Sequence, residues 1–369
     1  MLGSHIGIAQ GVSFHLSKRD SIAIWKAWAI RLIAIILALL VCAFVVVGIT
    51  GENPLNVYSG IVDGAIGSNR RIWVTIRETV VLLLISVGLM PAFKIRFWNL
   101  GAEGQILMGG AATAALMIYQ GSLPNVLLII LIMIASACAG IIWGVLPAFF
   151  KAKFNTNESL FTLMLNYIAM QIITFLIVFW EKPSGSNSVG IINADNKGGW
   201  FPEIFGSSYT LNIIIVLIVT VLMTVYMRYT KHGYEIAVVG ESHNTANYAG
   251  IKVSKVVIRT MIISSGICGL AGAVIVSGAS HTISTSTAGG RGFTAIIVAW
   301  MANLNPFGML VVSAFLVFMQ QGAIQIASQY GLNESASDII TGIIIFFLIG
   351  CEFFIKYKVK VKKTMEDAA

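Results

Sequence analysis

The sequence predicts an all-α membrane protein of about ten spans. Three observations predict this fold class: the chain is 57% hydrophobic, only 11% of its residues are charged, and long apolar stretches recur along it. A soluble domain averages about 25% charged residues, so this chain has too little charge to cover a surface in water. A bilayer removes that requirement, because side chains that face lipid are apolar.

A helical span needs about 20 mostly apolar residues. The stretches that meet or approach this length are 32–49, 78–95, 101–119, 125–149, 159–180, 210–228, 256–277, 292–303, 307–327 and 337–354. The third is rich in glycine and alanine, and 292–303 is too short to cross alone. Because the first stretch lacks a small-residue cleavage site, we expect an uncleaved helix there. Residues 22–30 suggest a separate amphipathic helix on the cytoplasmic face.

The basic residues predict the orientation of these spans. If successive loops alternate sides, 18 of the 24 Lys and Arg residues share the side of the N-terminus, and only five lie opposite. Lys and Arg accumulate on the cytoplasmic side, so both termini are expected there. We therefore expect a cytoplasmic segment 1–31, a transmembrane domain 32–354 and a basic cytoplasmic tail 355–369. The net charge of +8 then reflects orientation, and no nucleic-acid partner is expected.

Three connecting segments are long. Residues 50–77 and 181–209 are expected outside, the second as an irregular loop with Trp200 as an aromatic anchor at the membrane interface. Residues 229–255 are expected inside and are too polar to span. They read as short helices broken at Gly233, Gly240 and Gly250, which suits docking on a soluble partner.

The two halves of the chain share a pattern. In each, a span ends at a glycine-rich break (99–104 and 288–292), a helix of small residues follows, and two more spans come after it. The two breaks fall on opposite sides of the membrane, as an inverted repeat requires.

The chain carries no motif for catalysis. It lacks the Gly-x-x-x-x-Gly-Lys-Ser/Thr nucleotide loop, His-Glu-x-x-His and Gly-x-Ser-x-Gly. Its four cysteines lie far apart in apolar stretches and read as small packing residues. We expect no enzymatic activity, no metal site and no cofactor in this chain.

Polar residues within spans are costly in a bilayer and so mark candidate functional positions. Asn99, Gly101, Glu103 and Gln105 cluster at the first break. They suggest a substrate pathway or gate, because unwound backbone is tolerated only against protein or a water-filled cavity. Alternatively, Asn99 caps the following helix and Glu103 pairs with Lys94 or Arg96 at the inner interface.

Two further residues are candidates for the pathway. Arg291 opens the short eighth stretch, and it either faces the translocation path or extends to the outer headgroups. Asn166 lies in the middle of the fifth stretch, where it either contacts substrate or bridges helices.

Four separated motifs resemble a known family. They are Phe97-Trp-Asn-Leu-Gly-Ala-Glu-Gly-Gln105, Asn157-Glu-Ser-Leu-Phe-Thr-Leu-Met-Leu-Asn-Tyr-Ile168, Gly233-Tyr-Glu-Ile-Ala-Val-Val-Gly240 with Asn247-Tyr-Ala-Gly-Ile251, and Gly289-Gly-Arg-Gly-Phe-Thr-Ala-Ile296 with Asn305-Pro-Phe-Gly308. Together they resemble the nucleoside branch of the branched-chain amino acid and simple-sugar ABC permeases.

The resemblance implies a type II-like importer permease that moves nucleosides across a bacterial cell (inner) membrane. It implies a homologous second permease chain, a cytoplasmic ATPase with two nucleotide-binding domains that holds ATP and Mg, and a lipid-anchored extracytoplasmic binding protein. It also implies an ATPase-coupling set, which here comprises Gly233, Glu235, Gly240, Glu241, Ser242, Asn247, Gly250, Asn305 and Pro306.

Other functions remain open at this point. The same fold serves ABC permeases for simple sugars or branched-chain amino acids. An ion-coupled secondary transporter would need no ATPase but usually has buried acids, for which only Glu103 qualifies here. A structural or assembly membrane protein would need no matched polar breaks.

Overall fold

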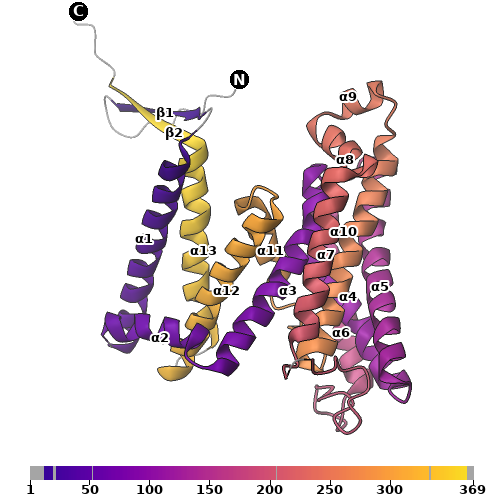
Figure 1. Ribbon diagram of the computed structural model, residues 1–369. Coiled ribbons are helices and arrows are strands. Elements are labelled where there is room, and N and C mark those ends of the chain that lie inside the picture. The colour runs from indigo at the N-terminus through magenta and orange to yellow at the C-terminus, as the bar shows by residue number, and fades with distance from the viewer. Residues whose placement is uncertain (1–11, 20–21, 52, 205, 332–333, 364–369) are drawn as a thin grey trace, which may run out of the picture. The chain divides into compact units, whose positions relative to one another are not determined.

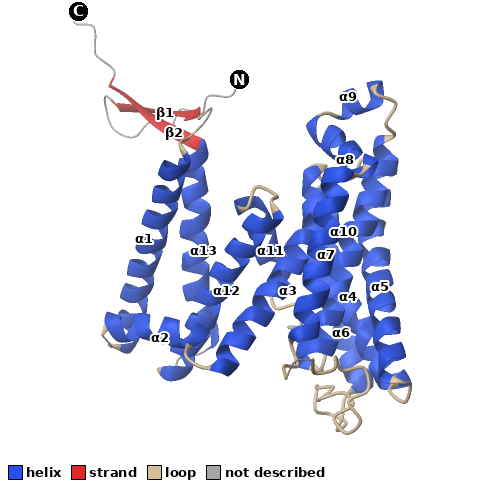
Figure 2. Cartoon of the chain, in the orientation of Figure 1, coloured by secondary structure: helices blue, strands red, loops and turns tan. Residues whose placement is uncertain are grey.

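The computed structural model describes residues 12–19, 22–51, 53–204, 206–331 and 334–363, and these are almost entirely helical (Figure 2). They form two compact units, one from Met1–Ser68 with Phe318–Ala369 and one from Asn69–Val317. Residues 1–11 of the predicted N-terminal segment and 364–369 of the predicted tail lie outside the described residues.

Each of the ten predicted stretches coincides with a helix (Figure 1). These helices are α1 (Ile24–Thr50), α3 (Asn69–Lys94), α4 (Ala102–Gln120), α5 (Asn125–Phe154), α6 (Glu158–Trp180), α7 (Thr210–Tyr229), α10 (Val253–Ile275, continued by the π-helical turn Val276–Ser280), α11 (Arg291–Met301), α12 (Pro306–Gln329) and α13 (Glu334–Lys356). Within the described residues, eight helices are long and apolar enough to cross a membrane. Of the other two, α4 is more polar and α11 is short.

Some predicted boundaries are wrong. Helix α1 is continuous from Ile24, so residues 22–30 form no separate surface helix. The predicted outer loop 50–77 contains α2 (Pro54–Ile66) and the first turns of α3. Helix α2 begins where the Asn53 side chain accepts a hydrogen bond from the Leu55 amide at 3.0 Å.

The polar segment 229–255 folds as α8 (Lys231–Glu241) and α9 (His243–Tyr248). Gly233 and Gly240 lie inside α8, so the prediction that they break the segment is wrong. The break falls at Ser242, whose hydroxyl accepts from the Thr245 amide at 3.3 Å and caps α9. Gly250 has a φ of 75°, the left-handed conformation that ends a helix as predicted.

The first unit pairs a strand near the N-terminus with a strand near the C-terminus. Strand β1 (Val12–Lys18) pairs antiparallel with β2 (Tyr357–Lys363), a sheet that the helical sequence pattern did not predict. Below it α1 packs on α13, and Arg31 forms an ion pair of 2.7 Å with Glu352. Both described ends therefore share one side of this unit, which agrees with an even number of crossings.

The second unit is built around α10, which packs against α3, α4 and α5, and 83% of its most apolar stretch is buried. Glycines let the backbones approach closely where α10 crosses its neighbours. A Cβ at Gly269 would collide with the Ser136 carbonyl and with Gly140 of α5, and a Cβ at Gly109 of α4 would collide with Gly269 itself. Small residues at such crossings are typical of membrane helices.

The long segment 181–209 folds against the end of α10. The Trp200 ring stacks on His281 with centroids 3.7 Å apart, and its indole N–H donates to the Ile192 carbonyl at 2.8 Å. The Ile192 amide in turn donates to the His281 carbonyl at 2.8 Å. Trp200 therefore packs the loop against the end of α10, and its predicted role as an anchor at the membrane interface stays a prediction.

Replacing Gly269 with valine is expected to destabilise the second unit by about 3 kcal/mol, because the branched side chain has no space at the crossing of α5 and α10. The measurement is the thermal unfolding midpoint of the detergent-purified protein. The control is Gly48→Ala in α1, where a Cβ meets nothing within 4 Å. Equal midpoints for the two variants would contradict the packing argument.

Acidification is expected to loosen the Trp200–His281 stack. Burial lowers the pKa of His281 from 6.5 to about 4, helped by the positive charges of Arg77 and Lys197. The unfolded segment therefore takes up a proton before the packed ring does, so local stability is complete above pH 6.5 and falls as the pH drops towards 4.

Hydrogen exchange of residues 189–201, corrected for the intrinsic effect of pH, tests this expectation. Exchange should be severalfold faster at pH 5 than at pH 7, and His281→Gln should remove most of the difference. A wild-type segment with the same protection at both pH values would refute it.

Candidate functional site

Two helices of the second unit begin inside the protein rather than at its ends. Helix α4 starts at Ala102 after the non-helical segment 95–101, and α11 starts at Arg291 after the segment 281–290. The first amides of a helix lack partners within it, so each start needs acceptors from elsewhere. The two starts meet, so the two breaks do not lie on opposite sides of the membrane as predicted. We call the residues Leu100–Gln105 and Gly290–Gly292 the helix junction.

Glu103 holds the helix junction together. Its carboxylate accepts hydrogen bonds from the amides of Gly290 at 2.6 Å and Gly292 at 2.8 Å, and it is almost fully buried. An acid in the first turn of α4 thus caps α11, where the helix dipole also favours a negative charge. The alternative that Glu103 pairs with Lys94 or Arg96 is wrong, since both of its oxygens face α11.

Gly292 is required at this contact. A Cβ there would lie 2.6 Å from the Glu103 amide nitrogen and 2.7 Å from its carboxylate. Any other residue would push the two helix starts apart.

The side-chain amides of Asn99 and Asn166 supply hydrogen-bond partners to the backbone around the start of α4. Asn166 of α6 donates to the Leu100 carbonyl at 2.8 Å and accepts from the Gly104 amide at 2.9 Å, so it bridges α6 to the helix junction. Asn99 accepts from the Gly101 amide at 3.0 Å and from the Gln105 side chain at 3.3 Å. Asn99 therefore stabilises the turn that leads into α4, whose N-cap residue is Gly101.

Arg291 is anchored within the protein. Its guanidinium donates two hydrogen bonds to Glu78 of α3, at 2.7 and 3.0 Å, and reaches the Thr287 and Ala288 carbonyls at 3.3 and 3.4 Å. Glu78 also pairs with Arg77 at 2.6 Å. The alternative that Arg291 extends to headgroups is therefore wrong. Glu78 was not among the predicted residues, although an acid at the start of an apolar stretch is a signal for such a position.

Two cavities flank the segment 281–290. One holds about 360 Å³ and is lined by Glu103, Leu163, Asn166, Tyr167, Met170, Thr285, Ser286, Gly289, Gly290 and Phe293. The other holds about 240 Å³ and is lined by Arg77, Glu78, Ile275, Ala279, Ser280, Thr282, Ser284, Ser286, Thr287 and Arg291. The first has a mainly apolar wall with two aromatic side chains, Tyr167 and Phe293, and we call it the aromatic cavity. The second is rich in hydroxyls, and we call it the hydroxyl-rich cavity.

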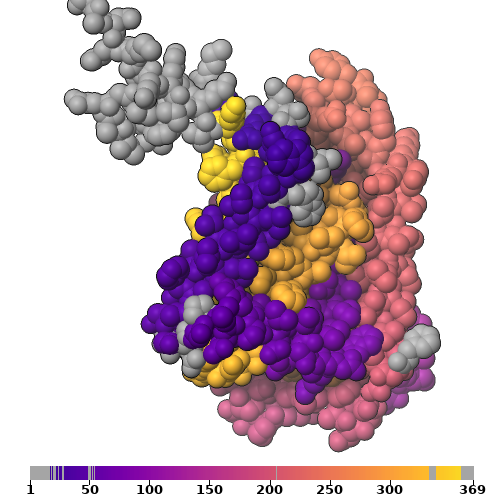
Figure 3. Space-filling view, turned by 60° about the vertical axis from the view of Figure 1, so that its left-hand side comes forward, coloured from indigo at the N-terminus to yellow at the C-terminus, as the bar shows by residue number. Residues whose placement is uncertain are grey.

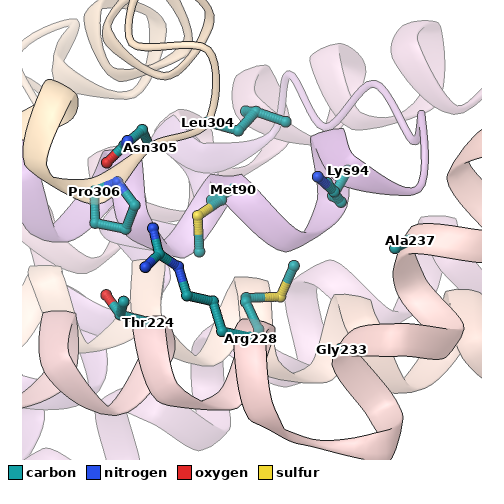
Figure 4. A pocket seen from close by; sticks show the side chains of 10 residues that line it. Met90, Lys94, Thr224, Arg228, Gly233, Ala237, Leu304, Asn305 and Pro306 are labelled. Atoms are coloured by element: carbon teal, nitrogen blue, oxygen red, sulfur yellow. The ribbon is translucent and has the colours of Figure 1, made fainter.

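The residues predicted for ATPase coupling gather at one end of the second unit. There α8, α9 and the turn 302–306 lie near the C-terminal ends of α3 and α7, with the two short helices at the molecular surface (Figures 1 and 3). We call this end the docking end. It contains a cavity of about 250 Å³ lined by Met90, Lys94, Thr224, Met227, Arg228, Gly233, Ala237, Leu304, Asn305 and Pro306 (Figure 4).

The cavity of the docking end is basic. Arg228 extends from α7 towards the side formed by Met90 and Pro306, and Lys94 enters from α3 (Figure 4). Neither cation has an ion-pair partner within the described ranges of the chain. An acidic group of a partner would therefore find two free cations here.

Some of the predicted coupling residues hold the docking end together instead of facing outwards. Gly240 is buried, and a Cβ there would collide with the Lys94 carbonyl. Gly233 is likewise buried at the turn from α7. Glu235 pairs with Arg259 of α10 at 2.6 Å, and this hydrogen bond holds the pKa of Glu235 below its ordinary value.

Asn305 caps α12 by accepting from the Phe307 amide at 3.0 Å, with Pro306 in the first turn. The exposed members of the predicted set are Glu241, Asn247, Gly250 and Asn305. Exposed aromatic residues join them at this end and were missed: Tyr248 is 94% exposed, Phe307 75% and Tyr234 66%. Aromatic residues are enriched in protein–protein interfaces, so a group of exposed ones beside polar short helices suits contact with a partner.

A continuous chain of packing contacts links the docking end to the helix junction. Gly240 of α8 lies against Lys94, the segment after Lys94 carries Trp98, and Trp98 stacks on Trp300 of α11 with centroids 5.3 Å apart. The start of the same helix α11 is held by Glu103.

Comparison with known proteins agrees with this architecture. Residues 72–349 match the family of the branched-chain amino acid transport system permease component. The chain is 28% identical to the nucleoside ABC transporter permease protein NupB of Lactococcus lactis, over 91% of this chain and 94% of that protein. It is 29% identical to the guanosine ABC transporter permease protein NupP of Bacillus subtilis, over 86% and 92%.

The glucose ABC transporter permease protein TsgB13 of Haloferax volcanii is 24% identical, over 95% of this chain and 94% of that protein. In each of the three organisms a second permease protein also matches, at 21 to 27% identity. Because the family match covers most of the sequence and contains both the helix junction and the docking end, the chain belongs to the permease components of the branched-chain amino acid transport systems.

Proposed function

We propose that this chain is one of two permease subunits of an ATP-driven importer in a bacterial cell membrane, and that the importer carries nucleosides. The similarity to a nucleoside and a guanosine permease over nearly the full length of the chain carries this proposal. The fold supplies the membrane path, and hydrolysis of ATP with Mg takes place in a partner chain.

The charges near the helix junction support a neutral cargo. Glu103 is satisfied by backbone amides, and Glu78 is satisfied by Arg77 and Arg291. A permanently charged cargo would favour an unpaired counter-charge along its path. Each of these groups already has a partner, so a nucleoside would pass without displacing an ion pair.

The docking end is the proposed contact with the cytoplasmic ATPase. Helix α9 is exposed except for Ala246, carries Tyr248 at its tip and is polar elsewhere. The excess of Lys and Arg on the same side as both termini supports its cytoplasmic location.

The contacts within the second unit suggest how a pull on α9 reaches the helix junction. Helix α8 is tied to α10 by Glu235 and Arg259 and lies on Lys94. A displacement of α8 would move the segment 95–101, and Trp98 would transmit this movement to α11. The start of α11 borders both cavities, so rocking of this helix would open or close the path.

The remaining partners follow from the same proposal. A homologous second permease chain would form the other half of the path, as the paired permeases in the three organisms support. A lipid-anchored binding protein outside the membrane would deliver the cargo. Membrane lipid would surround the two permeases.

Glucose is the second candidate cargo, because a glucose permease is similar over 95% of this chain. Affinity purification in mild detergent followed by reconstitution separates the possibilities. Recovery of an ATPase with two nucleotide-binding domains, and ATP-dependent uptake of labelled adenosine in preference to glucose, is expected. Uptake without an ATPase would indicate an ion-coupled transporter and would refute the importer.

Replacing Glu103 with alanine is expected to slow uptake about tenfold while the ATPase still co-purifies. The change leaves two amides at the start of α11 without an acceptor, at a cost of about 1–3 kcal/mol for each buried group. Glu103→Gln retains one carbonyl acceptor and should be affected less. Wild-type uptake by the alanine variant would show that the helix junction is not part of the gate.

Replacing Tyr248 with alanine is expected to weaken ATPase binding by on the order of 2 kcal/mol, as for other aromatic residues at interface centres. The measurement is the amount of ATPase retained on immobilised permease over increasing salt. Phe179→Ala is the matched control, since Phe179 is 71% exposed at the far end of α6. Equal retention by both variants would move the ATPase contact away from α9.

A further inference from the structure

The aromatic cavity beside the helix junction is open on one side and is bordered by three parts of the second unit. Leu163, Asn166, Tyr167 and Met170 lie at positions i, i+3, i+4 and i+7 of α6 and so form one continuous face of that helix. Phe293 enters from the first turn of α11, and Thr285 and Ser286 from the segment before it. At about 360 Å³ the cavity lies within the range of small-molecule sites.

Its two aromatic side chains are accessible. Tyr167 is 58% exposed and Phe293 is 43% exposed. Rings from two different helices at one cavity offer faces on which a flat heteroaromatic ring can stack, and stacking of this kind is how proteins commonly hold nucleobases.

The polar groups of the cavity suit a neutral ligand. Glu103 is the only carboxylate in its lining, and both of its oxygens accept backbone amides. Asn166 is likewise committed to Leu100 and Gly104. In the described part of the chain the hydroxyls of Tyr167 and Thr285 have no hydrogen-bond partner, so they are free to bind the polar edge of a ligand.

The neighbouring hydroxyl-rich cavity shares Ser286 with the aromatic one. Ser280, Thr282, Ser284 and Thr287 line it. A ligand with a flat ring and an attached polyhydroxyl group would therefore find a matching environment for each part on the two sides of Ser286.

We propose that the cavity between α6 and α11 is a recognition subsite for the nucleobase of the cargo, with Tyr167 and Phe293 stacking on the base and Thr285 and Ser286 facing its sugar. This proposal rests on the proposed function and deepens it. The permease itself then contributes to cargo selection, in addition to the external binding protein.

Photolabelling of the purified complex with 8-azidoadenosine tests the location of the subsite. After irradiation, mass spectrometry should find the label on peptides that contain Tyr167 or Phe293, and excess adenosine should suppress it. Label confined to other peptides, or label that adenosine does not suppress, would overturn the proposal.

Substitutions test the stacking. In the reconstituted complex, the double variant Tyr167→Leu with Phe293→Leu keeps the apolar volume but removes both rings, and adenosine uptake should fall about tenfold. Tyr167→Phe with Phe293→Tyr keeps the rings and should retain most of the uptake. Phe175→Leu, an exposed ring two turns further along α6, should leave uptake unchanged and controls for loss of an aromatic residue.

The outcomes separate this proposal from the proposed function. A wild-type complex that imports glucose but no nucleoside would refute the nucleoside importer. A wild-type complex that imports adenosine, together with a double leucine variant that does so at the same rate, would refute the nucleobase subsite alone.

Discussion

The hydrogen bonds from the start of α11 to Glu103 are the constraint on which the second unit depends. Away from water, every backbone amide needs a partner within the protein. A helix that starts in the interior therefore needs an acceptor supplied by another element, and here a carboxylate from α4 takes that place. The buried negative charge of Glu103 is tolerated because two backbone amides donate to it and because it lies at the positive end of the α11 dipole.

The same requirement explains the side chains around the helix junction. Asn166 supplies both a donor and an acceptor to backbone that leaves the helix before α4. Gly292 allows the approach that brings Glu103 within reach. The polar residues that the sequence places in apolar stretches thus have a structural role, because they bind exposed backbone groups. Any functional role of the same residues arises because the helix junction borders the aromatic cavity.

The second unit connects its docking end with its cavities through packed side chains. Close backbone contact at Gly240 and stacking of Trp98 on Trp300 leave little room for α8 to move without α11. At the other end of α11, the aromatic cavity and the hydroxyl-rich cavity lie on the two sides of the segment that precedes it. The residues of the docking end and the residues that line the cavities are far apart in the sequence, but both groups contact the single short helix α11.

Apolar length and basic asymmetry were sufficient to predict the ten helical stretches and a common side for the two termini, because both signals are local and additive along the chain. Four local motifs likewise indicated the family. Only the tertiary structure decided that Glu103 faces α11 rather than Lys94, that Arg291 pairs with Glu78, and that Gly240 is buried. These partners lie up to 213 residues apart, and no local pattern specifies which of several charged or polar groups will meet once the helices pack.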